Sequence, residues 1–87
     1  MNSNENIRAL MILEIIGRPA EHIITSLNEI IEQIKTEKGV KVIQREVKPA
    51  VEMKEEKNIY TTFAEVEVEV EHPMHLALLV FKYIFNF

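Results

Sequence analysis

Residues 59–71 decide the fold, with the sequence Ile59-Tyr-Thr-Thr-Phe-Ala-Glu-Val-Glu-Val-Glu-Val-Glu71, because valine and glutamate alternate strictly along the second half. Successive side chains of a β-strand point to opposite faces, so this pattern predicts a strand with one apolar and one acidic face. Such a strand belongs to an antiparallel sheet that is covered on one face and open to water on the other. The apolar face carries Ala64, Val66, Val68 and Val70, and the acidic face carries Glu65, Glu67, Glu69 and Glu71.

Two further strands precede this stretch. Residues 7–16 are rich in branched side chains and end at Gly17, which predicts a strand, and residues 40–47 predict another that stops before Pro49. The first of these strands carries apolar residues on both faces, so we expect its second face to be covered as well. Residues 49–58 are charged and aperiodic, and they predict a flexible hairpin loop.

Two helices complete the pattern. The first opens at Pro19, repeats apolar residues at helical spacing over residues 20–34, and is expected to end at Gly39 in a left-handed conformation. The second follows His72 and Pro73 and runs over residues 74–83. Because that segment is apolar around most of its circumference, we expect it to be buried on most sides.

The order of these elements is β-α-β-β-α. A right-handed crossover of the first β-α-β unit places the first and third strands side by side, with both helices on one face of the sheet. The prediction is therefore an α+β fold, a ferredoxin-like two-layer sandwich with a missing or rudimentary fourth strand. We expect one domain over residues 7–87, preceded by a disordered segment of residues 1–6.

Composition excludes several classes of function. The 14 acidic residues outnumber the 10 basic ones, the net charge is -4, and the basic residues are dispersed, so a nucleic-acid partner is not expected. The chain has no cysteine, which excludes disulfides, thiolate metal sites and cysteine nucleophiles. No signal peptide or membrane-spanning segment is predicted. We therefore expect a cytoplasmic protein that needs no cofactor and does not bind membranes.

The strand over residues 7–16, the turn Gly17-Arg18-Pro19-Ala-Glu-His22 and the strand Tyr60-Thr-Thr-Phe-Ala-Glu-Val-Glu-Val68 together resemble a family of small uncharacterised archaeal proteins. In broader outline the layout resembles ACT-type regulatory domains. That second resemblance implies binding of a small ligand near the first strand-helix turn, where Gly17, Arg18 and Pro19 match. Exposed amides at the start of the helix and the Arg18 guanidinium would be the local donors for an anionic ligand.

Other chemistry rests on few residues. His72 and His75 have a spacing that can bring two imidazoles to one metal ion, and Glu71 is the nearest third candidate, whereas a metal site needs three or four ligands. We expect these histidines to be structural or exposed to solvent, with His72 placed at the start of the second helix. The acidic row is expected to be a solvated face that pairs with Lys41 and Arg45. A small metal-binding protein or enzyme using His72, His75 and Glu71 is the alternative.

The leading hypothesis is a non-enzymatic module that associates with itself, either a regulatory ligand binder or an assembly subunit. Too many apolar residues fall on the predicted open face and the carboxyl-terminal end for one small domain to bury. An unpaired edge of the first strand would be open to a second chain. We therefore predict a homodimer or larger homo-oligomer. The predicted interface residues are Leu10, Ile12, Ile43, Val47, Phe63, Ile84, Phe85 and Phe87.

Overall fold

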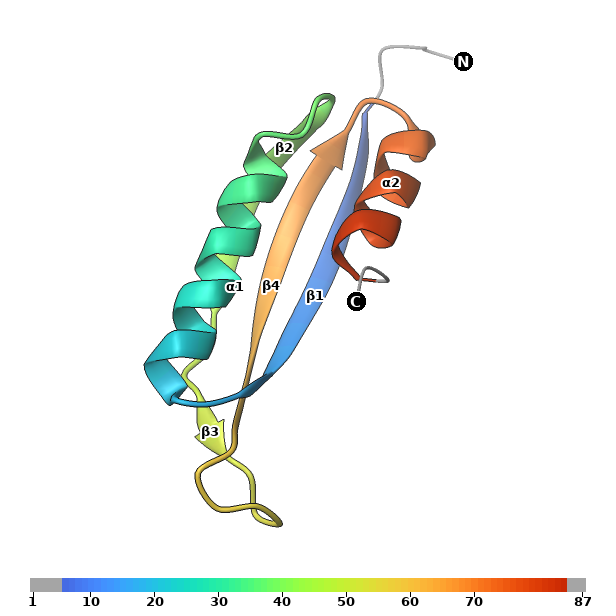
Figure 1. Cartoon of the computed structure of the whole chain (residues 1–87). Helices are drawn as coiled ribbons and strands as arrows, with labels where there is room; N and C mark the ends of the chain where they lie inside the picture. The colour runs from blue at the N-terminus through green and yellow to red at the C-terminus, as the bar shows by residue number, and fades with distance from the viewer. Residues whose placement is uncertain (1–5, 85–87) are drawn as a thin grey trace.

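The structure is a computed structural model that describes residues 6–84 (Figure 1). A long strand β1 is followed by helix α1 and strand β2, then by a short strand β3, the long strand β4 and helix α2. The bounds are β1 Ile7–Gly17, α1 Ala20–Lys35, β2 Val40–Val47, β3 Val51–Glu52, β4 Tyr60–Val70 and α2 Pro73–Tyr83.

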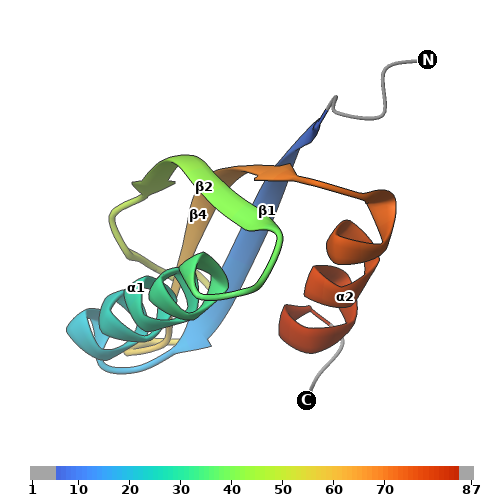
Figure 2. The ribbon, with the colours of Figure 1, turned by 90° about the horizontal axis from the view of Figure 1, so that it is seen from above.

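The strands form one antiparallel sheet in which β4 is central. β1 pairs with one edge of β4, and β2 and β3 pair with the other edge. Both helices lie on the same face of this sheet (Figure 2). The fold is therefore α+β. The prediction that the first and third long strands lie side by side is confirmed, because β1 pairs with β4. The element order is compatible with the ferredoxin-like arrangement.

The alternation along β4 places its side chains as the sequence predicts. Ala64, Val66, Val68 and Val70 are fully buried under the helices. Helix α1 covers this face with four buried side chains, Ile23, Leu27, Ile31 and Ile34. Since these side chains recur every three or four residues, the helix presents one continuous apolar stripe to the valines of β4.

Helix α1 ends earlier than the sequence suggested. Its last residue is Lys35, and the backbone N–H groups of Thr36 and Glu37 donate to the carbonyl oxygens of Gln33 and Ile34, respectively. Gly39 does adopt a left-handed conformation, with φ 78°, but it lies in the turn that leads into β2. The side-chain hydroxyl of Thr36 also donates to the Gln33 carbonyl oxygen, which satisfies the end of the helix without a glycine.

Strand β1 lies at an edge of the sheet over the described residues, and the expectation that both its faces are covered is wrong. Met11 and Leu13 point to the helices and are buried. Leu10, Ile12 and Ile16 point to the opposite face and are 61%, 58% and 60% exposed. Neither helix covers that face, because both lie on the other one, and its side chains are left exposed by residues 6–84.

Strand β2 contains a β-bulge that the sequence did not reveal. The register with β4 shifts between Val42 and Gln44, so Ile43 is the additional residue. Beyond the bulge the faces are exchanged, and Arg45 and Val47 lie opposite Val66 and Ala64 on the helix side. Val47 therefore packs against the core, and its predicted place on the open face is wrong.

The segment between β2 and β4 is more regular than a plain loop. Val51 and Glu52 form β3, which pairs with Thr61 and Tyr60 at the start of β4. Residues 54–57, which follow, are all exposed. The predicted loop thus contains one short strand before a charged tip.

Helix α2 is far less buried than its apolar sequence suggested. Leu79 is its one buried residue, at 2% exposure, among the described residues of this helix. Met74, Leu78 and Phe81 are 62%, 57% and 68% exposed. The expectation that α2 is buried on most sides is therefore wrong for a single chain.

Candidate functional site

The turn between β1 and α1, which the ACT-like resemblance singles out, borders an open hollow of about 600 Å³. Arg18, Pro19 and Ala20 line it from the turn, and Asn58 and Tyr60 line it from the start of β4. Glu21 lies in the same hollow, so the Arg18 guanidinium shares it with a carboxylate that disfavours an anion. Two amides of the first helical turn, those of His22 and Ile23, already donate to the Pro19 carbonyl oxygen.

The two histidines of α2 have separate structural surroundings. His72 caps the helix, because its Nδ1 accepts a hydrogen bond of 3.1 Å from the backbone N–H of Met74. His75 packs against the backbone of Gly39 in the turn before β2. Its buried Nδ1 has no hydrogen-bond partner in the described part of the chain. Over residues 6–84 no group of three His, Cys, Asp or Glu side chains could hold a metal ion, and Glu71 does not complete such a group.

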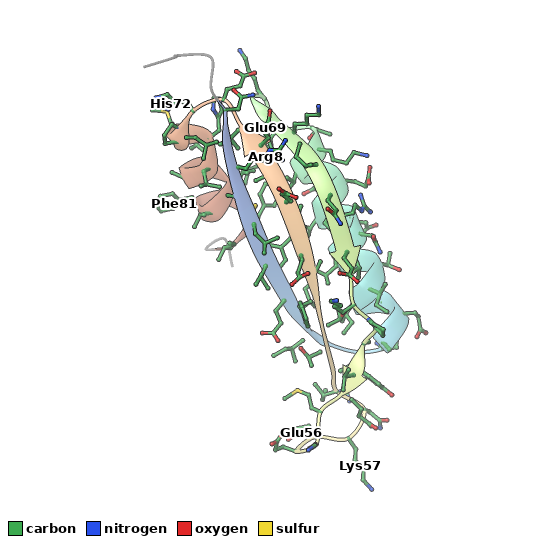
Figure 3. All side chains as sticks on the ribbon, turned by 180° about the vertical axis from the view of Figure 1, so that it is seen from behind. Arg8, Glu56, Lys57, Glu69, His72 and Phe81 are labelled. Atoms are coloured by element: carbon green, nitrogen blue, oxygen red, sulfur yellow. The ribbon has the colours of Figure 1, made fainter. Side chains whose placement is uncertain are left out.

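The acidic row of β4 is partly neutralised by β1. Arg8 lies 3.2 Å from Glu69 and 3.9 Å from Glu67, measured between side-chain nitrogen and oxygen atoms, as the view of the open face shows for Arg8 and Glu69 (Figure 3). A hydrogen bond from Asn6, the one from Arg8 and the nearby charges of Arg8 and Lys41 lower the pKa of the Glu69 carboxyl. Arg45, the other predicted partner, instead pairs with Glu32 of α1 because the bulge turned it to the helix side.

A hydrogen-bonded cluster holds the carboxyl-terminal end of α2 against the turn after α1. The Tyr83 hydroxyl donates to Glu37, and the Lys82 ammonium lies 2.7 Å from the same carboxylate. Both contacts lower the pKa of the Glu37 carboxyl, and the contact with Lys82 has the larger effect. Burial of the phenol and the adjacent carboxylate raise the pKa of Tyr83 to about 12. This cluster and Leu79 fix α2 beside β1.

The largest unexplained feature is an apolar surface around the free edge of β1. It has two parts, the exposed side chains of β1 and a row along α2 at the spacing of one helix face. Helix α2 lies beside β1 on the side away from β4 (Figures 1 and 2). We call this the edge surface, and its exposed residues are Leu10, Ile12, Ile16, Met74, Leu78, Phe81 and Ile84.

A shallow hollow of about 180 Å³ lies within the edge surface, between β1 and the carboxyl-terminal end of α2. Ile12 and Ile15 line it from the strand, Ile30 from α1, and Tyr83 and Ile84 from α2. Its lining is mainly aliphatic, which suits an apolar side chain better than a charged ligand.

The structure brings only some of the predicted interface residues together. Leu10, Ile12 and Ile84 belong to the edge surface, and Phe63 is 37% exposed on the open face of β4. Ile43 is half-buried in the bulge. Val47 faces the core, and Phe85 and Phe87 lie outside the described residues.

Sequence reasoning missed Ile16 and the row along α2. Ile16 shares the parity of Leu10 and Ile12, and Met74, Leu78 and Phe81 recur at steps of four and three. Both signals were therefore present, but an apolar helix without a polar side is equally typical of a buried one.

Comparison with known proteins gives one match. No curated protein and no solved structure matches this chain. In the described part of the chain, no helix has the length and apolar character needed to cross a membrane. The model of the MJ0538 family matches residues 8–84, from the Arg8 position of β1 to the end of α2. Since that match spans nearly the whole chain, the protein belongs to the MJ0538 family.

Proposed function

We propose that the protein is a non-enzymatic module with a ferredoxin-like fold, whose fourth strand is missing or rudimentary, and that it associates with itself through the edge surface. The observation that carries this proposal is the coincidence of an unpaired strand edge with two rows of exposed aliphatic side chains. Leu10 and Ile12 flank the edge on the open face, and Met74 and Leu78 extend it along α2. Many exposed apolar side chains near an unpaired strand edge of a small domain favour an interface with another protein chain.

Three of the residues that could suggest an enzyme already have structural partners. His72 caps α2, and Glu67 and Glu69 are engaged by Arg8. These contacts favour a binding or assembly role over catalysis.

Self-association is tested by light scattering after size exclusion, at micromolar protein concentration. We expect a mass of at least twice the 10.2 kDa of one chain. Leu10→Glu should shift the protein to the monomer, because a carboxylate at the interface would lose its hydration. Val51→Glu is the matched control, since Val51 is 62% exposed but lies on β3, across the sheet from the free edge. A native protein that elutes at the mass of one chain would contradict the proposal.

A regulatory role with a small ligand is the second candidate, and the hollow beside Arg18 favours it. A thermal-shift screen with amino acids, nucleotides and divalent metal ions tests it. An increase in melting temperature with one amino acid that disappears in Arg18→Ala would support ligand binding at this turn. An unchanged increase in that variant would exclude the turn, and an increase with zinc that depends on His75 would favour the metal-binding alternative.

A further inference from the structure

The free edge of β1 is long and regular. All of β1, from Ile7 to Gly17, pairs with β4 in one uninterrupted register without a bulge. Along its other side, alternate residues of β1 direct their N–H and C=O groups outward, and no strand of residues 6–84 pairs with them. A long, unbulged edge with few charges is a template for another strand. The sequence of β1 shows which strand fits it.

Strand β1 is complementary to itself in the antiparallel direction. Residues that lie opposite each other in an antiparallel pair share a face, so open-face residues of β1 can face only open-face residues of a second β1. Centred on Met11, the pair places Arg8 opposite Glu14 of the second copy, and Leu10 opposite Ile12 of the second copy. The twofold axis repeats both contacts. Each charged side chain therefore lies opposite one of opposite charge, and each aliphatic side chain of the centre lies opposite another aliphatic side chain.

The neighbouring registers are less favourable. Centred on Leu10, the pair places Arg8 opposite an isoleucine, and Glu14 opposite Asn6. Centred on Ile12, it places Leu10 opposite Glu14. Cross-strand pairs of opposite charge stabilise a sheet, and a charge opposite an aliphatic side chain does not. The Met11 register is therefore the one that the side chains favour.

The charges that this register joins are available. The Arg8 side chain is 62% exposed even while it contacts Glu67 and Glu69. Glu14 accepts a hydrogen bond of 3.1 Å from the Thr61 hydroxyl, but no cation in the described part of the chain forms an ion pair with it. A second copy supplies that cation to Glu14.

Helix α2 is much shorter than the strand edge that it lies beside. Its 11 residues span about 16 Å, whereas the 11 residues of β1 span about 37 Å. Because β4 ends opposite Ile7, α2 begins at that end, and its carboxyl-terminal residues Tyr83 and Ile84 lie beside Ile12 and Ile15 of β1. A twofold axis at Met11 places Ile7 of the second copy opposite Ile15, so the second α2 begins at the other end of the joined strands.

We propose that two copies of this chain pair antiparallel along β1 with Met11 opposite Met11, which extends the two sheets into one continuous sheet. This register rests on the proposed self-association and names the strand that occupies the free edge. Arg8 and Glu14 set the register, and Leu10 and Ile12 form its apolar centre.

Disulfide cross-linking tests the register, since the chain has no cysteine of its own. We expect a mixture of the Leu10→Cys and Ile12→Cys variants, refolded together and oxidised, to form a covalent dimer. Each variant alone should not, because its two cysteines would lie diagonally, beyond the roughly 7 Å that a disulfide can span between Cα atoms. Both positions are exposed, so neither substitution threatens the fold.

A charge reversal gives a second measurement. Glu14→Arg would place two arginines opposite each other and should raise the dimer dissociation constant about tenfold or more. Glu46→Arg is the matched control, because Glu46 lies on the same face but on β2, away from the free edge. Equal dissociation constants for the two variants would overturn the role of Glu14.

The outcomes separate the register from the association itself. A covalent dimer from Leu10→Cys alone or from Ile12→Cys alone would overturn the Met11 register and leave self-association standing. A dimeric native protein without any cross-link would show that the copies meet through another surface. A monomeric native protein would overturn both the register and the proposed function.

Discussion

Gly39→Ala should destabilise the protein because of a single contact between the turn after α1 and helix α2. Gly39 has φ 78°, a conformation that costs a residue with a Cβ about 1 to 2 kcal/mol. A Cβ there would also lie 2.6 Å from Cδ2 and 2.8 Å from Cε1 of the His75 ring. Relief of such crowding in a packed site costs about 1 to 3 kcal/mol more. We therefore expect a total loss of roughly 2 to 5 kcal/mol.

The contribution of the ring is isolated by repeating the substitution in a His75→Ala background. In that background only the cost of the positive φ angle remains, so Gly39→Ala should lower the free energy of unfolding by about 1 to 2 kcal/mol. The difference between the two backgrounds is the coupling between Gly39 and His75, about 1 to 3 kcal/mol. Gly17→Ala is the control, because its Cβ would meet only the Ile23 side chain, at 3.1 Å, and its φ is not positive.

Urea denaturation followed by far-UV circular dichroism measures these free energies of unfolding. All variants are compared at one protein concentration, since association would make stability concentration-dependent. The same cost of Gly39→Ala in both backgrounds would refute the argument that His75 packs over this turn. A cost of Gly17→Ala as large as that of Gly39→Ala would show that neither the φ angle nor the ring is the cause.

Three further predictions concern helix α2 and the charged tip. Leu79→Ala should lower the free energy of unfolding by about 2 to 5 kcal/mol, whereas the exposed neighbour Leu78→Ala should change it by less than about 1 kcal/mol in the monomer; urea titrations compare them. The Tyr83 pKa is raised from 10.0 to about 12, so stability should be fully present below pH 10 and fall as the pH rises toward 12. Tyr83→Phe should remove that loss, and an unchanged alkaline profile would refute it. Replacing residues 54–57 by a two-residue turn should cost less than about 1 kcal/mol, because loop closure depends weakly on length and these residues are exposed.

The candidate surface could be predicted only in part. Leu10 and Ile12 could be predicted, because alternation along the strand puts them on the face that the helices do not cover. The structure places both on that open face. The apolar pattern of α2 predicts a buried helix, although the row of Met74, Leu78 and Phe81 is largely exposed in one chain. Amphipathic pattern shows which residues need cover, but it does not say whether that cover comes from the same chain.

The sequence by itself determined the order of the long strands and the helices, the two layers and the face of β4 that is buried, but not the short strand β3. Strict alternation in β4 and the helical spacing in α1 are local periodicities. The first fits only a strand with one buried face, and the second fits only a helix with one buried face. The tertiary structure alone decided where Arg45 and Val47 point, because the bulge near Ile43 leaves no mark on the composition of β2. It also decided that α2 is held by Leu79 and the cluster of Tyr83 with Glu37. These are contacts between segments distant in sequence, and no local pattern specifies their partners.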